Sequence, residues 1–286
     1  MRTLIRLVTV LLALGLVAAA CGSDDDAPAA SEVEGAGEEA AEGDLPDLGG
    51  RTVTVAVENA YLPFNYIDGE TGEALGWDYA AIDEMCVRLN CVPDYQTFSW
   101  EPMIQAVADG QFDMAADGIT ITEERAEVVA FSDGYINIDQ RIMVGLDNSD
   151  IASAAELEGA DCNVGTQTGT TNYDTALSLV GEGRITAYET FPFAVQALIV
   201  GDVCAVIMDE TAGQGYVGEN ADAIKLVGES LSSDQLGFIF PLDSELVGPF
   251  NQAIRAMKAD GTMAALGEEY FSGAFTITYD DIAFPE

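Results

Sequence analysis

Alternating apolar and polar positions, interrupted by glycine and proline, organise the chain after its first fifty residues. Residues 52–57 alternate in this way, and a helical spacing follows over residues 79–89, which Asp78 can cap. Residues 92–98 have strand character, and the apolar spacing from Met103 to Val107 marks another helix. Strands that alternate with helices at this spacing predict an α/β fold with mostly parallel sheets.

The second half of the chain repeats this alternation of strands and helices. Residues 162–166 are typical of a short strand, and Thr171 with Asp174 forms a capping pair that opens a helix. Three apolar residues of that helix are expected to face inward: Ala176, Leu177 and Val180. Residues 203–208 are typical of a buried strand that ends at Asp209, and open α/β sheets bind ligands at such strand ends.

The first twenty residues have the organisation of an export signal. Two arginines precede an apolar run, Leu7 to Val17, which is too short to span a membrane stably. Small residues then lead to Cys21, which resembles the lipidated cysteine of a bacterial lipobox. Ala18 departs from the branched aliphatic residue that a lipobox prefers. The alternative is an ordinary secretory signal that is cut after Ala20.

Residues 21–49 are predicted to form an extended tether. The segment from 22 to 49 holds ten acidic side chains and no Lys or Arg, and the rest is mainly Ala, Gly, Ser and Pro. Such a composition offers too little apolar surface to offset the entropy of ordering, and its charges repel one another. Directly after a lipidated Cys21, this segment would be a stalk between membrane and domain.

The chain is strongly acidic, with 50 Asp and Glu residues against 10 Lys and Arg residues and a formal net charge of −40. A surface of this sign repels nucleic acid and anionic lipid. We therefore expect no nucleic-acid partner, and membrane contact only through the lipid.

Five cysteines and no histidine are present. If Cys21 takes the lipid, an even number remains, and exported proteins retain disulfides. Cys86 and Cys91 flank the end of a predicted helix, while Cys162 and Cys204 each begin a predicted strand and could bridge if those strands are neighbours. The spacings are not those of zinc sites, so we expect neither a metal nor another cofactor.

The segment from Met114 to Tyr135 carries the clearest binding chemistry. Gly118 breaks a strand, hydroxyls follow, and Arg125 comes three residues after Thr122. Small residues allow close approach of a ligand, helix starts bind anions, and a guanidinium can hold a carboxylate through two hydrogen bonds. Alternatively, Thr122 only caps a short helix and Arg125 pairs with a neighbouring glutamate at the surface.

Further residues extend this set to a pocket for an α-amino acid. The turn at Thr171 is a second helix start for the carboxylate, next to Arg125 and Thr120. Asp209 would take the ammonium group. Two aromatic residues would enclose the rest of the ligand: Tyr61 and Trp100.

With these features in place, the chain resembles the family 3 solute-binding proteins of amino-acid ABC transporters. The matching segments are NAYLPFNY (59–66), LGWDYA (75–80), FSWEPMIQAVADGQFDMAADGITITEERAEVVAFSDGY (98–135), VGTQTGTTNYDTA (164–176) and VCAVIMDE (203–210). They follow the family's order and span nearly the whole globular region. GITITEER followed by FSDGY is a specific signal, unlike a lone GTT.

The resemblance implies a two-lobed periplasmic-binding-protein-like fold of type II, with two crossover strands and hinge closure on the ligand. The lobes would be residues 51–141 plus 236–286 and residues 146–232. It also implies a monomer that is exported, is anchored by lipid to the outer face of the cell membrane, and delivers an L-amino acid to a membrane permease.

The resemblance assigns roles to individual residues as well. The residues that would hold the α-carboxylate are Arg125, Thr120, Thr170 and Thr171. Those that would hold the α-ammonium are Asp209 and Gly118. The pair Cys86 and Cys91 matches a disulfide of some members.

Other residues are assigned to the ligand's side chain. Tyr61 and Trp100 match the family's aromatic walls, and Glu58 falls where several members place an acid. Gln167 lies where members vary with specificity. Asp117 departs from the small uncharged residue of many members, and either enters the pocket or turns outward. An acid-rich pocket would favour arginine, lysine, histidine or glutamine.

Two other classes of function compete with transport. The same fold hosts dehydratases that act on small carboxylic acids, and Glu58 or Asp117 could be a general acid or base. We expect no enzyme, because no histidine, nucleophile elbow or metal cluster accompanies them. A sensor domain of a receptor kinase or channel would need a further apolar span, which we do not expect in this chain.

Overall fold

The structure is a computed structural model that describes residues 44–272 and 282–283, all within one compact unit, Glu42–Glu286. The predicted export signal, Cys21 and most of the tether lie outside the described residues. No helix in the described part of the chain is long and apolar enough to cross a membrane.

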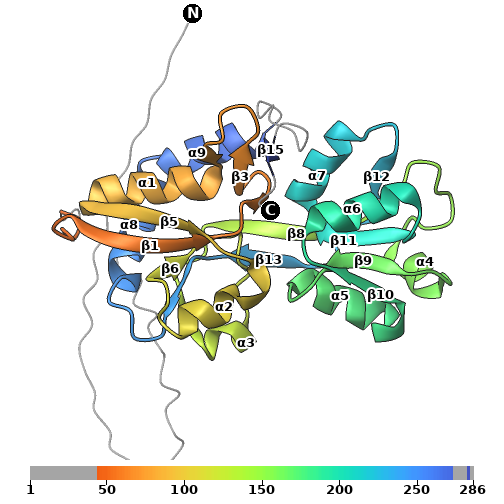
Figure 1. Cartoon of the computed structure of the whole chain (residues 1–286), viewed down its shortest axis with the longest axis horizontal. Helices are drawn as coiled ribbons and strands as arrows, with labels where there is room; N and C mark the ends of the chain where they lie inside the picture. The colour runs from red at the N-terminus through yellow and green to blue at the C-terminus, as the bar shows by residue number, and fades with distance from the viewer. Residues whose placement is uncertain (1–43, 273–281, 284–286) are drawn as a thin grey trace, which may run out of the picture. The chain divides into compact units, whose positions relative to one another are not determined.

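The first lobe is built on a five-stranded sheet with strand order β5-β1-β6-β14-β7 (Figure 1). Its strands are β1 (Arg51–Val57), β5 (Cys91–Thr97), β6 (Met114–Ala115), β7 (Val129–Phe131) and β14 (Ile239–Pro241). Its helices are α1 (Trp77–Leu89), α2 (Trp100–Ala108), α3 (Glu123–Ala126), α8 (Val247–Ala259) and α9 (Thr262–Phe271). A small sheet adds β2 (Ala60–Tyr61), β3 (Asn65–Asp68), β4 (Ala74–Leu75) and β15 (Ile282–Ala283).

The second lobe is built on a sheet with the path β10-β9-β11-β8-β12, and β13 pairs with β8 beside it. Its strands are β8 (Ile136–Gly145), β9 (Val164–Gln167), β10 (Ile185–Tyr188), β11 (Ala205–Asp209), β12 (Ile224–Val227) and β13 (Ser233–Leu236). Its helices are α4 (Ala154–Gly159), α5 (Thr171–Val180), α6 (Phe191–Val200) and α7 (Glu210–Glu219), with a 3₁₀ turn η1 (Glu182–Arg184).

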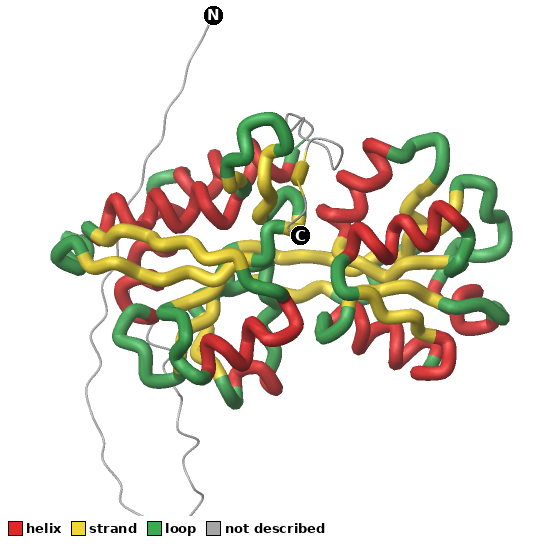
Figure 2. Tube along the Cα trace, in the orientation of Figure 1, coloured by secondary structure: helices red, strands yellow, loops and turns green. Residues whose placement is uncertain are grey.

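Two strands carry the chain between the lobes. The first half of β8 pairs antiparallel with β13, from Ile136 opposite Leu236 to Asp139 opposite Ser233. The second half of β8 pairs with β11 and β12 inside the second sheet. Figure 2 shows β8 and β13 running between the two groups of strands. The limits at 51–141 plus 236–286 and at 146–232 stay predictions.

The sheets are less parallel than the sequence pattern predicts. β1 runs parallel to β5 and β6, and β9 runs parallel to β10 and β11. The strands that come from the crossing between lobes, β8 and β14, run antiparallel to their neighbours. Local spacing predicts several of the strands, whereas the direction of β14 depends on the return of the chain to the first lobe.

Three local predictions are wrong by a residue or by a face. Asp78 is not the cap of α1: Gly76 is the N-cap, and Asp78 is fully buried within the first turn. Thr170, not Thr171, caps α5, because its side chain accepts the backbone N–H of Tyr173. Leu177 is 41% exposed rather than inward, while Ala176 is buried.

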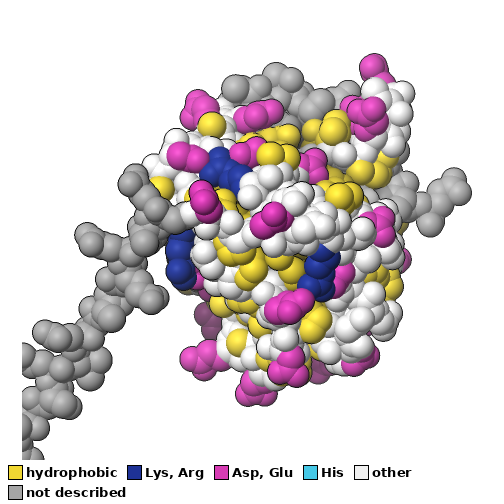
Figure 3. All heavy atoms as spheres, turned by 90° about the vertical axis from the view of Figure 1, so that its left-hand side faces the viewer, with side chains coloured by type: hydrophobic (Ala, Val, Ile, Leu, Met, Phe, Trp, Pro, Cys, Tyr) yellow, Lys and Arg dark blue, Asp and Glu magenta, His cyan; other side chains and the backbone are white. Residues whose placement is uncertain are grey.

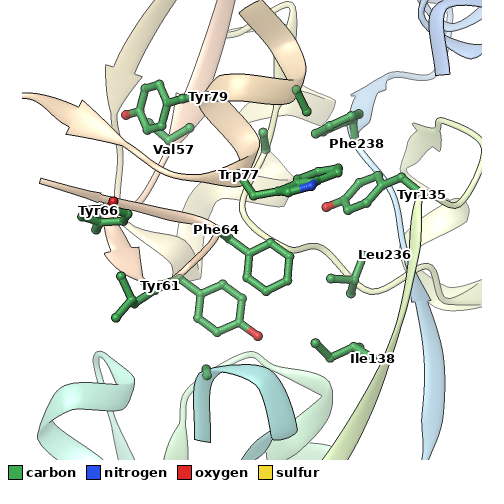
Figure 4. Close-up of a cluster of buried hydrophobic side chains, with 14 of the residues drawn as sticks. Val57, Tyr61, Phe64, Tyr66, Trp77, Tyr79, Tyr135, Ile138, Leu236 and Phe238 are labelled. Atoms are coloured by element: carbon green, nitrogen blue, oxygen red, sulfur yellow. The ribbon is translucent and has the colours of Figure 1, made fainter. Parts of the chain in front are cut away.

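A row of aromatic rings ties the first lobe's core to its cleft (Figure 4). Trp77 of α1 stacks on Tyr135 at 4.5 Å between centroids and lies 6.2 Å from Phe238. Phe64 continues the row and stacks on Tyr61 at 5.0 Å. Aromatic pairs of this kind stabilise a core beyond the area they bury. They fix the position of the Tyr61 ring.

The surface keeps the acidic character of the sequence. On the face drawn in Figure 3, acidic side chains are spread widely and basic ones are few. Arg51, Arg88 and Arg255 on the first lobe each pair with acidic side chains. Exposed pairs of this kind contribute little to stability, so the fold depends on its cores and cross-links.

Both predicted disulfides are present. Cys86 joins Cys91 at the end of α1, and Cys162 joins Cys204 just before the paired strands β9 and β11. The first closes a loop of 5 residues and the second a loop of 42 residues.

We predict that removal of the second disulfide destabilises the protein more than removal of the first. Loop-closure entropy gives about 4 kcal/mol for Cys162→Ser with Cys204→Ser and about 2 kcal/mol for Cys86→Ser with Cys91→Ser. Urea denaturation of the two double variants measures both values, and an equal or reversed loss would contradict this.

Candidate functional site

A single pocket gathers all eleven residues predicted to bind a ligand. It lies between the two lobes and comprises about 330 Å³ of space, part of which is open to solvent. The predicted residues that line it are Glu58, Tyr61, Trp100, Asp117, Gly118, Thr120, Arg125, Gln167, Thr170, Thr171 and Asp209. Asn172 and Phe191, which the sequence analysis missed, line it too. The described residues hold no cluster of His, Cys, Asp or Glu that could bind a metal ion.

Arg125 lies on α3 and points into the pocket. Thr122 caps α3 and accepts the Arg125 backbone N–H at 3.1 Å, so the capping role and the pocket role occur together. The guanidinium donates to the Thr120 carbonyl at 2.9 Å and to the Gly169 carbonyl at 3.3 Å. Its central carbon lies 5.3 Å from the Trp100 ring, within cation–π distance. Arg125 forms no ion pair among the described residues, and three of its five N–H donors remain for a ligand.

The start of α5 faces Arg125 from the second lobe. Because Thr170 is the cap, the Thr171 hydroxyl is left to the pocket. It accepts from Gln140 Nε2 at 3.0 Å and lies 3.3 Å from the Thr120 hydroxyl. Gln140 occupies one acceptor position of Thr171, and the hydroxyl keeps its proton and a second lone pair for Thr120 or a ligand. The N-terminus of a ten-residue helix adds a partial positive charge there.

Asp209 lies at the end of β11, opposite Arg125 in the pocket. Its carboxylate accepts from the Tyr61 hydroxyl and, at 2.9 Å, from Asn172 Nδ2. Burial raises the pKa of Asp209. The carboxylate can still bind a cation through its remaining lone pairs, because each carboxylate offers about four acceptor sites.

Gly118 makes room for the Tyr61 ring. It has a φ of +55°, and a Cβ built on it would lie 2.5 Å from Cε1 of Tyr61. A larger residue would strain the backbone and displace the ring that donates to Asp209. This glycine therefore keeps Tyr61 in place on the pocket wall.

Two further carboxylates, Glu58 and Asp117, line the same pocket. Gln167 Nε2 donates to both Glu58 oxygens, at 3.1 and 3.3 Å. Asp117 is 4% exposed and lines the pocket, so it does not turn outward. Asn65 Nδ2 bridges Asp117 at 2.7 Å and Asp78 at 3.0 Å.

These carboxylates have strongly perturbed acidities. Burial, with the charge of Asp117 added, raises the pKa of Glu58 from 4.5 to about 8. Burial likewise raises the pKa of Asp117 and of Asp78 from 3.8 to about 7 in each case. At neutral pH, bound protons partly neutralise these three carboxylates, and a bound cation would take the place of those protons.

Several hydrogen bonds cross from one lobe to the other at the pocket. Tyr61 bonds to Asp209, and Gln167 bonds to Glu58. Arg125 bonds to Gly169, and Thr120 contacts Thr171. The residues that line the pocket thus also hold the lobes together, which is the arrangement expected of a site that closes around a ligand.

The two missed residues differ in how they could have been found. Asn172 directly follows Thr171 in the turn that opens α5, and its amide supports Asp209. A general expectation that buried carboxylates need donors could have indicated it. Phe191 lies 6.0 Å from Tyr61 between ring centroids, across the lobes, and no local pattern places it there.

Comparison with known proteins identifies the family model that matches this chain: "Bacterial extracellular solute-binding proteins, family 3", over residues 53–273. The L-cystine-binding protein TcyA of Bacillus subtilis is 28% identical over 221 residues, which cover 77% of this chain and 81% of TcyA.

Solved structures are similar as well. An ancestral arginine-binding protein bound to glutamine has a TM-score of 0.72 and 32% identity, covering 77% of this chain and 97% of that protein. The arginine-, lysine-, histidine-binding protein ArtJ of Geobacillus stearothermophilus has a TM-score of 0.72 and 29% identity, covering 77% and 95%.

The raised carboxyl pKa values predict how stability depends on pH. A carboxyl whose pKa is raised by folding stabilises the fold fully below its unfolded pKa and loses this effect as pH rises through its folded pKa. In the ligand-free protein, the titration of Glu58 should therefore lower the free energy of unfolding as the pH rises from 4.5 to about 8. The slope should reach at most about 1.4 kcal/mol per pH unit for one group.

Glu58→Gln tests this dependence, because the amide imitates the protonated acid. The fall in stability near pH 8 should become shallower, since Asp78 and Asp117, with pKa values of about 7, are mostly ionised there. Denaturation at fixed pH steps measures the slope, with the exposed Glu101→Gln as the matched control. An unchanged slope above pH 7 in Glu58→Gln would count against the assignment.

Proposed function

The chain belongs to family 3 of the bacterial extracellular solute-binding proteins, and from this we propose that it captures an L-amino acid with a cationic or strongly hydrogen-bonding side chain for an ABC importer. The candidates are arginine, lysine, histidine and glutamine. The amino-acid, cystine and arginine binding of its relatives supports the ligand class.

The pocket lining offers partners for both charged groups of an α-amino acid. Arg125, the Thr120 and Thr171 hydroxyls and the start of α5 provide donors and positive charge for the carboxylate. Asp209 faces the same space and would bind the ammonium. These contacts come from both lobes, so a bound amino acid would add bonds between them.

The observation that carries the choice of side chain is the imbalance of charge. Three buried carboxylates, Glu58, Asp117 and Asp209, share the pocket with one guanidinium, Arg125. After the ligand's own α-groups pair with Arg125 and Asp209, two acids and the Gln167 amide remain for its side chain. A cation there offsets the cost of burying those acids, whereas an acidic side chain adds to it.

Transport completes the proposal. The closed, ligand-bound form would dock on the permease of an ABC importer, as a monomer held at the outer face of the membrane by a lipid on Cys21. Loading by lobe closure fits a chain in which β8 and β13 connect the lobes and the ligand pocket lies between them.

Isothermal titration of the protein with arginine, lysine, histidine, glutamine and glutamate tests the ligand class. We expect Arg125→Ala and Asp209→Asn to weaken every amino acid by about 100-fold or more, because each leaves a charged ligand group unpaired. Glu58→Gln should weaken cationic ligands selectively and leave glutamine nearly unchanged.

The matched control is Asp94→Asn, an exposed acid on β5 outside the pocket. Tighter binding of glutamate than of arginine would contradict the proposal. Mass spectrometry of the released ligand separates binding from catalysis, since a binding protein returns the amino acid unchanged and a dehydratase-like enzyme would not.

A further inference from the structure

A second, larger cavity adjoins the amino-acid pocket. This cavity, here called the annex, contains about 1470 Å³ of space and opens to solvent. Residues of both lobes line it: Glu58, Ala60, Thr97, Phe98, Ser99, Glu189, Thr190, Pro192, Phe193 and Gln196. Glu58 is common to the annex and the pocket.

Three backbone segments border both cavities. In one segment Ala60 lines the annex and Tyr61 the pocket, and in another Ser99 lines the annex and Trp100 the pocket. At the start of α6, Phe191 lines the pocket while its neighbours on both sides line the annex. The same three backbone segments therefore form one side of each cavity.

Gln167 connects the pocket side to the annex side through hydrogen bonds. Its Nε2 donates to Glu58 and, at 2.9 Å, to the backbone carbonyl of Glu189 on the annex side. Both partners line the annex, while Gln167 itself lines the pocket. A ligand group could replace the Gln167 amide as the donor to Glu58. The Gln167 side chain could then move aside and connect the cavities, and the buried Glu58 carboxylate would still have a hydrogen-bond partner.

The annex has the chemistry of a site for a cation on an apolar stem. Glu58 and Glu189 are acidic, and no Lys or Arg is among the ten residues that line it. Phe98 and Phe193 supply rings, and Phe193 is 58% exposed. Aromatic rings beside carboxylates favour cations over anions.

We infer that the site accepts an α-amino acid with a long side chain that carries a cationic group at its far end, in addition to the α-ammonium. The α-groups would lie in the pocket, and the cationic end of the side chain would lie in the annex near Glu189. The inference rests on the proposed function, because it needs the α-groups held by Arg125 and Asp209. It defines the substrate class as basic amino acids that carry an Nε-linked, amine-bearing substituent.

Nε-glycyl-lysine is the probe, with Nε-acetyl-lysine as its neutral match and lysine as the unextended reference. Isothermal titration should show that the protein binds the glycyl compound at least as tightly as lysine. The acetyl compound should bind more weakly than the glycyl compound, because it has the extension without the cation.

Two variants in the annex locate the extension. Ser99→Trp places a large ring in the annex and should weaken Nε-glycyl-lysine by about tenfold or more, because the ring competes with the extension for space. Glu189→Gln should weaken it by about threefold to fivefold, the range of a partly exposed ion pair. Neither change should alter lysine binding. Glu182→Gln is the matched control, an exposed acid of the same lobe that is not in the annex lining.

The outcomes separate this inference from the function on which it rests. Lysine binding with no measurable binding of Nε-glycyl-lysine would overturn the inference and leave amino-acid capture intact. If Ser99→Trp binds both lysine and Nε-glycyl-lysine as tightly as the unaltered protein does, the extension does not lie in the annex. That result would also overturn the inference. If no amino acid binds at all, the proposed function itself fails.

Discussion

Three carboxylates buried beside one guanidinium are the constraint on which the rest of this structure depends. Burial of a charge is costly unless donors or a counter-charge compensate it. The chain supplies donors from both lobes: Tyr61 and Asn172 for Asp209, and Gln167 for Glu58. The fold itself holds one of these donors in place, since the ring of Tyr61 stacks on Phe64. The acidity of the pocket therefore requires the lobes to meet, and lobe contact in turn excludes the water that would weaken recognition of the ligand's charges.

Local sequence was sufficient for the parts of the site that depend on one element. The positions of Arg125 after Thr122 and of Asp209 at a strand end follow from caps and apolar runs, and the structure places both in the pocket. The sequence pointed to Thr171 as the cap because Asp174 follows it three residues later, whereas Tyr173 occupies that position after Thr170. Only the three-dimensional helix start shows which hydroxyl bonds to the backbone and which is left for a ligand.

The parts that sequence could not predict depend on contacts between distant segments. The polar environment of Asp78 comes from Asn65, which also bridges to Asp117 across 52 residues of sequence. Asp78 therefore appears in the pattern as a helix cap although the structure buries it completely. The direction of β14 follows from the return of the chain to the first lobe, and the approach of Phe191 to Tyr61 follows from contact between the two lobes.

The contrast between site residues fixed by one helix or strand and those fixed by contacts between distant segments also explains how one fold can serve several ligands. The α-groups of an amino acid would be held at the ends of α5 and β11 and at Arg125, whose positions are set by the lobes' main secondary structure. The side-chain end is bounded instead by Glu58, Gln167 and the irregular segments beside them, which also border the annex. Substitutions there change charge and length without disturbing a sheet. Substitutions at the border between pocket and annex would therefore change specificity, while the contacts proposed for the amino-acid head would stay the same.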